Sequence, residues 1–234
     1  MKFLIILPYF NRPNLVKFAI KSVLSQSHCD WQMVLCDDGS DIHVQDVLDS
    51  MSIDDSRINI KRLNDTLHQK QSIGSRSGVM INEACVESDC DIAIILCDDD
   101  GLFPGYLDNL NKFYIENQSI YYSYGSVSLY DPEPFIDSSL MPEINLNSPL
   151  NHGHAVMPSC MVDASQVSWR LNNDTRSLFP SPQTTNLDEE VFRKLHNLYG
   201  LCVFNGITAQ YKGWFSDQMG NRMIDGSGIE PRIQ

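Results

Sequence analysis

Positive charge is scarce in this chain of 234 residues. Lysine and arginine together number 17 against 30 aspartates and glutamates, which leaves a formal net charge of −13. Such a surface repels phosphate backbones and anionic headgroups, so we expect no non-specific binding to nucleic acid or to anionic lipid. The sequence also lacks an apolar run long enough to cross a bilayer, which predicts no transmembrane segment.

Paired cysteines are missing as well. The seven cysteines are odd in number and scattered, and none of them forms a C-x-x-C pair. Several lie in apolar runs, where a reduced cysteine behaves as a small hydrophobic side chain. The apolar start of the chain is stopped by Pro8, too early for a signal peptide. These features favour a reducing, cytoplasmic location.

Short apolar runs alternate with amphipathic segments over the first hundred residues. The expected strands cover residues 2–7, 31–36, 58–60 and 91–97. The expected helices between them cover residues 13–23, 44–51 and 75–86. This alternation is typical of a parallel β-sheet covered by helices.

The rhythm changes after Pro104. Helices are expected at residues 106–115 and 187–198, and strands at residues 120–130, 157–162 and 201–210. No flexible linker separates the two halves of the chain. We therefore expect a single compact α/β unit with a mixed, mostly parallel sheet flanked by helices.

Acidic residues follow two of the expected strands. Asp98, Asp99 and Asp100 come directly after the apolar run at 92–97, and Asp37-Asp38-Gly39-Ser40 follows the run at 31–36. Open α/β sheets bind ligands at the carboxyl ends of their strands, and hard divalent cations prefer carboxylate oxygens. A metal ion held there could grip a diphosphate, which favours a nucleotide-handling enzyme. The alternative is a solvated acidic turn.

The order of these motifs resembles the family-2-type glycosyltransferases of the GT-A fold. The resemblance is carried by the opening LPYFNRPNLVKFAIKSVLSQSHCDWQMVLCDDGSD, by the helix GSRSGVMINEA and by the acidic triplet, and it covers residues 3–110. It implies a GT-A-like, Rossmann-like sheet. It also implies a nucleotide-sugar-binding half at 1–104, an acceptor-side half at 105–213 and a tail or lid at 214–234.

The resemblance implies donor-binding roles for several residues. Asp38 would accept a hydrogen bond from the uracil ring, and Arg76 would touch the base or a phosphate. Pro8 and Tyr9 would form walls of the base pocket. The residues by themselves also allow plainer roles, because Asp38 suits a turn or a helix cap and Pro8 ends a strand. Arg76 could equally be an exposed charge on a helix.

Within the triplet, Asp99 and Asp100 are the expected ligands of Mn²⁺ or Mg²⁺. Family members commonly place acids five and seven residues before the proline that corresponds to Pro104, which are Asp99 and Cys97 here. Cysteine is an unlikely ligand for these oxygen-preferring ions, and Asp100 is the second candidate ligand. Asp98 would then face the ribose or the metal.

An acidic helix start supplies the expected catalytic base. In the segment NLDEEVFRKLHNLYG the resemblance points to Asp188, with Glu189 and Glu190 as fallbacks. The implied reaction moves a hexosyl or pentosyl group from a nucleotide-sugar, a UDP-sugar by preference, to an acceptor hydroxyl by single displacement with inversion. The acceptor stays unidentified. Acids in a first helical turn can also simply complement the helix dipole.

Two other functions stay open. A nucleotidyltransferase also uses a sheet, acids and Mg²⁺, but it normally carries a glycine-rich basic loop after its first strand, and the loop at 9–13 has no glycine. A catalytically degenerate protein that binds a nucleotide-sugar without turnover is compatible with Cys97 and with the ambiguous base.

Overall fold

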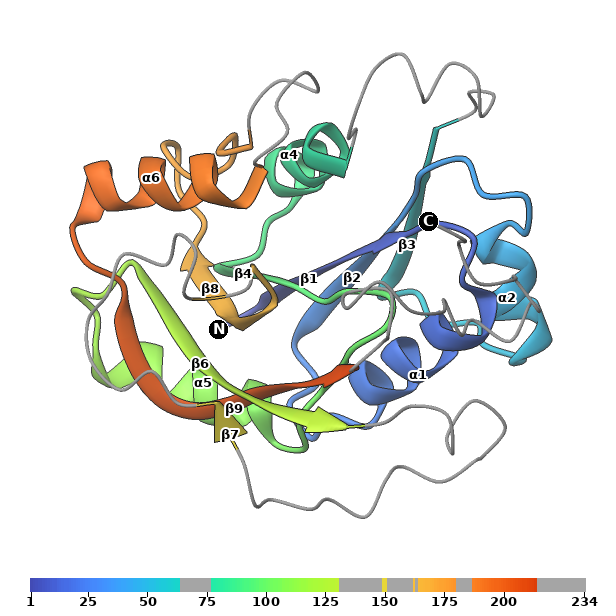
Figure 1. Ribbon diagram of the computed structural model, residues 1–234, viewed down its shortest axis with the longest axis horizontal. Coiled ribbons are helices and arrows are strands. Elements are labelled where there is room, and N and C mark those ends of the chain that lie inside the picture. Colours follow the sequence, from blue (N-terminus) through green and yellow to red (C-terminus); the bar gives the residue numbers. More distant parts are fainter. Residues whose placement is uncertain (64–76, 131–148, 151–161, 163, 180–186, 214–234) are drawn as a thin grey trace, which may run out of the picture.

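Among the residues that the structure describes, nine strands form one mixed sheet in the order β3-β2-β1-β4-β8-β6-β9-β5, with β7 paired to β6 (Figure 1). The computed structural model describes residues 1–63, 77–130, 149–150, 162, 164–179 and 187–213. The strands are β1 (Phe3–Tyr9), β2 (Trp31–Asp37), β3 (Ile58–Arg62), β4 (Ile92–Ile95), β5 (Gly101–Leu102), β6 (Tyr122–Tyr130), β7 (Pro149–Leu150), β8 (Val167–Arg170) and β9 (Val203–Gly213). The helices are α1 (Pro13–Leu24), α2 (Val44–Ser50), α4 (Ser77–Glu87), α5 (Tyr106–Glu116) and α6 (Leu187–Tyr199), with a short 3₁₀ turn, η2, at Ala164–Gln166.

The four strands β3, β2, β1 and β4 form a parallel run with β1 near its centre. Ile5 of β1 aligns with Met33 of β2 on one side and with Ile94 of β4 on the other. Parallel strands joined through helices all end at the same edge of the sheet. The loops that follow β1, β2 and β4 therefore lie side by side, as the sequence predicts.

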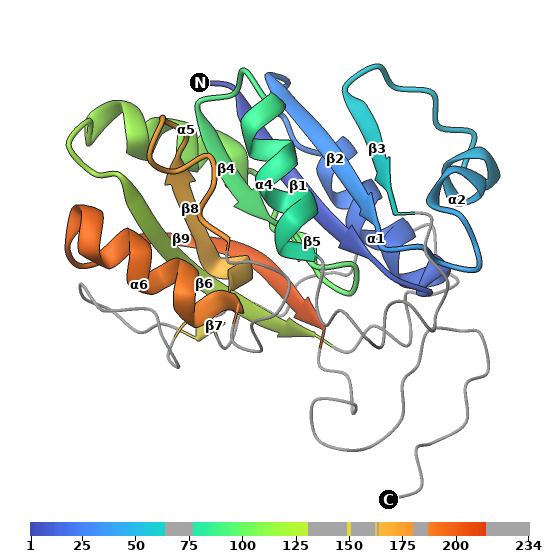
Figure 2. The same ribbon diagram turned by 90° about the horizontal axis from the view of Figure 1, so that it is seen from above.

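One hydrophobic core lies on each face of the sheet. Strand β1 contributes side chains to both cores because successive side chains point to opposite faces. Phe3, Ile5 and Leu7 pack with α1, α2 and α5 on one face. Leu4 and Ile6 pack with α4 and α6 on the other. Figures 1 and 2 show these helices covering opposite sides of the sheet. Each such side chain stabilises the fold by about 1.5–3 kcal/mol on burial, so β1 is anchored tightly.

The second half of the chain completes the sheet with antiparallel pairs and with one parallel pair, between β6 and β9. Strand β8 lies between β4 and β6 and is antiparallel to both. The sequence pattern predicts no strand there, and most of the strand expected at 157–162 lies outside the described residues. Strand β5 pairs with β9, which ties the segment after the acidic triplet into the sheet.

Several expectations lie beyond the part of the chain that the structure describes. The tail or lid at 214–234 is one, and Arg76 is another. Within the described segments, no helix is long and apolar enough to cross a membrane.

Candidate functional site

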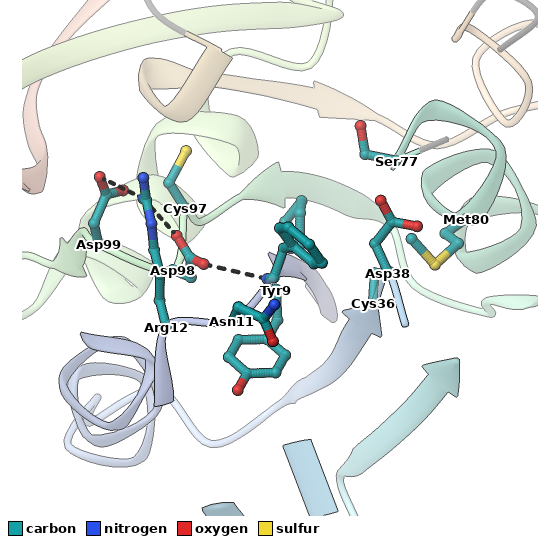
Figure 3. Close-up of a pocket in the computed structure, with 12 residues that line it drawn as sticks. Tyr9, Asn11, Arg12, Cys36, Asp38, Ser77, Met80, Cys97, Asp98 and Asp99 are labelled. Carbon is teal, nitrogen blue, oxygen red and sulfur yellow. Dashed lines mark hydrogen bonds and ion pairs between the residues drawn. The ribbon is translucent and has the colours of Figure 1, made fainter. Parts of the chain in front are cut away.

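A cavity of about 440 Å³ opens at the carboxyl ends of β1, β2 and β4 (Figure 3). Open α/β sheets bind their ligands at this edge. Its wall comes from three loops that lie far apart in the sequence and from the start of α4. The lining residues are Pro8, Tyr9, Phe10, Asn11, Arg12, Cys36, Asp38, Ser77, Met80, Cys97, Asp98 and Asp99.

The two aromatic residues after Pro8 are placed differently. Tyr9 is 1% exposed, its ring belongs to the core beside α1 and α2, and its hydroxyl donates to the Ile42 carbonyl at 2.9 Å. Phe10 lines the cavity and is 40% exposed. Tyr9 is the last residue of β1 and Phe10 follows the strand, so one aromatic ring packs inward and the next one stays open. Phe10 is thus the aromatic surface that a planar ligand can reach.

Asn11 holds the loop between β1 and α1 in a fixed shape. Its φ of 52° is left-handed, a conformation that asparagine tolerates better than most residues. Its backbone N–H donates to Ser40 Oγ at 3.1 Å, and its side-chain oxygen accepts from the Asp41 N–H at 2.7 Å. Pro13 then begins α1 in the position where a proline is best tolerated. These contacts join the loops after β1 and β2 into one rim.

The two acids of the Asp37-Asp38 pair have different environments. Asp37 is fully buried, and its carboxylate accepts from the N–H groups of Ser40 at 2.8 Å and Val44 at 3.2 Å. It also pairs with Arg62 Nη1 at 2.9 Å. Asp38 lines the cavity (Figure 3). The turn role that the sequence allows for Asp38 is therefore filled by Asp37, and the cap of α2 is His43, whose side chain accepts from the Gln45 N–H.

The acidic triplet sits on a loop that is pinned at both ends. Leu96 donates to the Ile6 carbonyl at 2.9 Å, and Asp100 closes a turn onto the Cys97 carbonyl at 3.1 Å. After the triplet, the Leu102 N–H donates to Ser22 Oγ of α1 at 2.9 Å. Gly101 faces the ring of Phe18 so closely that a Cβ there would collide with it. The loop therefore depends on glycine at this position.

Arg12 bridges two acids of the triplet. Its Nη1 lies 3.2 Å from Asp98 Oδ1 and 3.1 Å from Asp99 Oδ2 (Figure 3). The other oxygen of Asp98 faces the Phe10 N–H at 3.4 Å. Burial raises the pKa of Asp98 to about 7, while the charge of Arg12 opposes that rise. The buried Asp98 carboxylate is costly to charge, so a neighbouring cation such as Arg12 stabilises its charged form.

Asp99, Asp100 and Cys97 present ligand atoms that all lie within 4.8 Å of one another. Two carboxylates with this spacing fit a hard divalent ion such as Mn²⁺ or Mg²⁺. The Cys97 thiol suits such an ion poorly. Asp98 faces Arg12 and Phe10 and is not part of this cluster. The donor set therefore fits the expected metal through Asp99 and Asp100.

Comparison with protein families decides the broad class. The profile described as "Glycosyl transferase family 2" matches residues 4–157, which include every described residue that lines the cavity. The chain belongs to glycosyl transferase family 2. No curated protein matches the chain.

Solved structures share the fold of this family 2 chain at low sequence identity. S. aureus TarS matches with a TM-score of 0.64 and 14% identity, over 94% of this chain and 38% of TarS. TarS 1–349 in complex with UDP-GlcNAc matches with a TM-score of 0.62 and 13% identity, over 98% of this chain and 62% of that one. The mannosyltransferase PcManGT of Pyrobaculum calidifontis, in complex with GDP-Man and Mn²⁺, gives 0.62 and 11% over 91% and 56%. The chain thus spans less than two thirds of each relative.

Most donor-side residues expected from the sequence of this family 2 member come together. Pro8, Tyr9, Asp38, Asp98 and Asp99 line one cavity, and Asp100 is buried beside it.

The expected catalytic acids come from a different element. Asp188, Glu189 and Glu190 fall in the first turn of α6. The side chain of Asp188 is not among those the structure describes, whereas Glu189 is exposed and Glu190 half-buried.

The cavity is also lined by residues that the sequence pattern does not single out, and Phe10 and Arg12 are two of them. Phe10 directly follows Tyr9, the last residue of β1, so the alternation of an extended chain would have placed its ring opposite to that of Tyr9. Arg12 is a basic residue next to strand ends rich in acids, but only the structure shows which carboxylates it meets.

Proposed function

We propose that the chain is a metal-dependent glycosyltransferase that moves a sugar from a nucleotide-sugar to an acceptor hydroxyl. The observation that carries this proposal is the cavity that gathers Phe10, Asp38 and Asp99 at the ends of β1, β2 and β4. Family membership and the nucleotide-sugar complexes of structures with the same fold support it. A UDP-sugar is the preferred donor, with residues 1–104 as the donor half and 105–213 as the acceptor side.

In this proposal the base of the nucleotide lies between Phe10 and the β2 loop. Asp38 accepts a hydrogen bond from the uracil ring, and the open ring of Phe10 provides the aromatic contact, with Pro8 and Tyr9 forming the wall behind it. Arg76, at the approach to α4, contacts the base or a phosphate. Asp98 orients the ribose side of the site through its contact with the Phe10 N–H.

Asp99 and Asp100 would hold a Mn²⁺ or Mg²⁺ ion beside the diphosphate. The ion supplies Lewis-acid stabilisation of the negative charge on the leaving group. The fit of two carboxylates to a hard ion supports this assignment, and PcManGT is recorded with Mn²⁺.

We further propose that Asp188, at the start of α6, is the general base. It takes the proton of the acceptor hydroxyl while the acceptor oxygen bonds to the anomeric carbon and the bond to the diphosphate breaks. A base on the side opposite the leaving group gives inversion in one displacement. Glu189 and Glu190 are the alternatives if Asp188 proves dispensable.

Binding measurements with UDP and uridine test the donor assignment. UDP should bind more tightly with Mn²⁺ than in excess chelator, and Asp99→Ala should remove this difference without lowering the melting temperature much. Uridine lacks phosphate, so its affinity should be the same with and without metal. If UDP binds wild type and Asp99→Ala equally well in both conditions, the metal-bridged diphosphate is wrong.

Slow release of UDP distinguishes an active glycosyltransferase from a degenerate protein that only binds the nucleotide-sugar. The protein should hydrolyse a UDP-sugar slowly in the presence of Mn²⁺ without acceptor, and a degenerate binding protein would release no UDP.

Asp188→Asn should keep the donor affinity but lower turnover by roughly a hundredfold or more. A structural Asp188 would instead lower the melting temperature at nearly normal turnover per folded molecule.

A further inference from the structure

Arg12 occupies a position that none of the donor-binding roles above explains. It contacts Asp98 and Asp99 through one nitrogen, and the side chains of these acids are 11% and 9% exposed. Of the described residues that line the cavity, only Arg12 carries a positive charge. An ion pair between groups this well shielded is much less screened by salt than one on the open surface.

The backbone delivers Arg12 to this place. Asn11 is fixed in its left-handed conformation by contacts with the β2 loop, and Pro13 begins α1 immediately afterwards. Arg12 makes no side-chain cap on its own helix, and its guanidinium contacts two acids of the triplet. Its side chain is 23% exposed and borders the cavity, which leaves room for it to turn toward a bound anion.

Arg12 and a divalent ion would compete for the Asp99 carboxylate. Arg12 binds its Oδ2 atom, and the same carboxylate belongs to the cluster with Cys97 and Asp100 that fits a divalent ion. Two cations on one carboxylate repel each other, so binding of the second must weaken the first. The position of Asp99 therefore makes Arg12 and a divalent ion competitors for the same carboxylate.

We propose that Arg12 is the resident counter-cation of the donor site. In the ligand-free protein it neutralises Asp98 and Asp99. When the donor arrives with a divalent ion, Arg12 yields Asp99 and turns to the diphosphate. This inference rests on the proposed function, because it takes Asp99 as a metal ligand and a diphosphate as the incoming group. Arg12 thus lowers the affinity of the ligand-free site for the metal ion and raises the affinity of the metal-loaded site for the donor.

The experiment measures Mn²⁺ binding to the nucleotide-free protein by calorimetry or by the paramagnetic signal of free Mn²⁺. Arg12→Gln removes the competing charge, so its Mn²⁺ affinity should rise by roughly fivefold or more over wild type. In saturating Mn²⁺ the same variant should bind UDP roughly tenfold more weakly, because it has lost a charged donor to phosphate. Its uridine affinity should equal that of wild type.

Two further variants control the result. Lys21→Gln changes the net charge by the same amount on an exposed position at the other end of α1, so its Mn²⁺ and UDP affinities should stay at wild-type values. Arg12→Lys keeps the charge but loses the planar fork, so it should fall between wild type and Arg12→Gln in both assays. Melting temperatures establish that all variants are folded.

The outcomes distinguish this inference from the proposed function. If wild type binds Mn²⁺ and UDP but Arg12→Gln binds Mn²⁺ no more tightly than wild type, Arg12 does not compete for Asp99 and the inference is overturned. A weaker Mn²⁺ affinity in Arg12→Gln overturns it equally. If neither wild type nor Arg12→Gln binds Mn²⁺, the metal site itself fails, and the proposed metal-dependent function falls first.

Discussion

Asp37 and Asp38 are adjacent acids with the same chemistry, but their substitutions should affect different properties. Replacing Asp37 should lower stability, and replacing Asp38 should lower the affinity for uridine. Asp37→Ala removes a fully buried carboxylate that accepts from Ser40, Val44 and Arg62. Two backbone N–H groups lose their acceptor, and Arg62 loses its buried partner. Losses of this kind cost about 3–5 kcal/mol. In a chain of this length such a loss lowers the melting temperature by roughly 6–20 °C.

Asp38→Ala is the matched control one residue away. Asp38 borders the cavity and is only partly buried, so its removal should cost less than about 1 kcal/mol of stability. Its uridine affinity should fall by roughly tenfold or more, the scale of one hydrogen bond to a charged group. Asp37→Ala, where it is still folded, should bind uridine nearly as wild type does.

Thermal unfolding followed by circular dichroism and calorimetric titration with uridine measure both quantities on each variant. Asp37→Asn adds a useful intermediate, because it keeps the shape of the side chain but loses the charge that pairs with Arg62. Equal destabilisation by Asp37→Ala and Asp38→Ala would refute the division of roles. So would an Asp38→Ala variant with wild-type affinity for uridine.

Three further predictions concern the loop of the triplet and its neighbours. An alkylating reagent at pH 8 should label Cys97 and the exposed Cys29. It should not label Cys36, because burial raises the pKa of the Cys36 thiol to about 12. UDP with Mn²⁺ should protect Cys97 alone, which peptide mass spectrometry can measure. Cys97→Asp should increase the Mg²⁺-induced rise in melting temperature while lowering the melting temperature of the metal-free protein, because it adds a hard ligand and a like charge. Gly101→Ala should destabilise the fold by about 1–3 kcal/mol in urea unfolding by crowding Phe18, and unchanged stability would mean that the ring moves aside freely.

The parallel half of the fold could be predicted from the sequence because its signals are local. The apolar runs that became β1, β2 and β4 are short and continuous, and those of β2 and β4 lead into acids. Such runs indicate buried strands, and acids after them indicate a ligand edge. The five residues that were expected on the donor side and that line one cavity follow from this pattern and from the family resemblance.

Other features depend on contacts between distant residues. Strand β8 has four residues, and it is held by pairing with β4 and β6 and by the hydroxyl of Tyr114, which donates to the Ser168 carbonyl at 2.9 Å. That the ring of Tyr9 is buried and the ring of Phe10 is exposed depends on the Ile42 carbonyl, which accepts from the Tyr9 hydroxyl, and on the core around that ring. The division between Asp37 and Asp38 depends on Arg62, which lies on another strand. None of these partners is near in sequence, so short-range patterns do not reveal them.

The placement of Tyr9 and Phe10 has a consequence for how this chain can vary. Inserting or deleting one residue within β1 would exchange the faces of every side chain beyond that point, because the strand repeats every two residues. After a deletion the tyrosine would take the place of Pro8, which lines the cavity, and the phenylalanine would take the place of Tyr9, where the Ile42 carbonyl would lose the hydroxyl that donates to it. A change of length in β1 would damage the core and the ligand cavity together. We therefore expect natural variants of this chain to change the identity of residues in β1 but to keep its length.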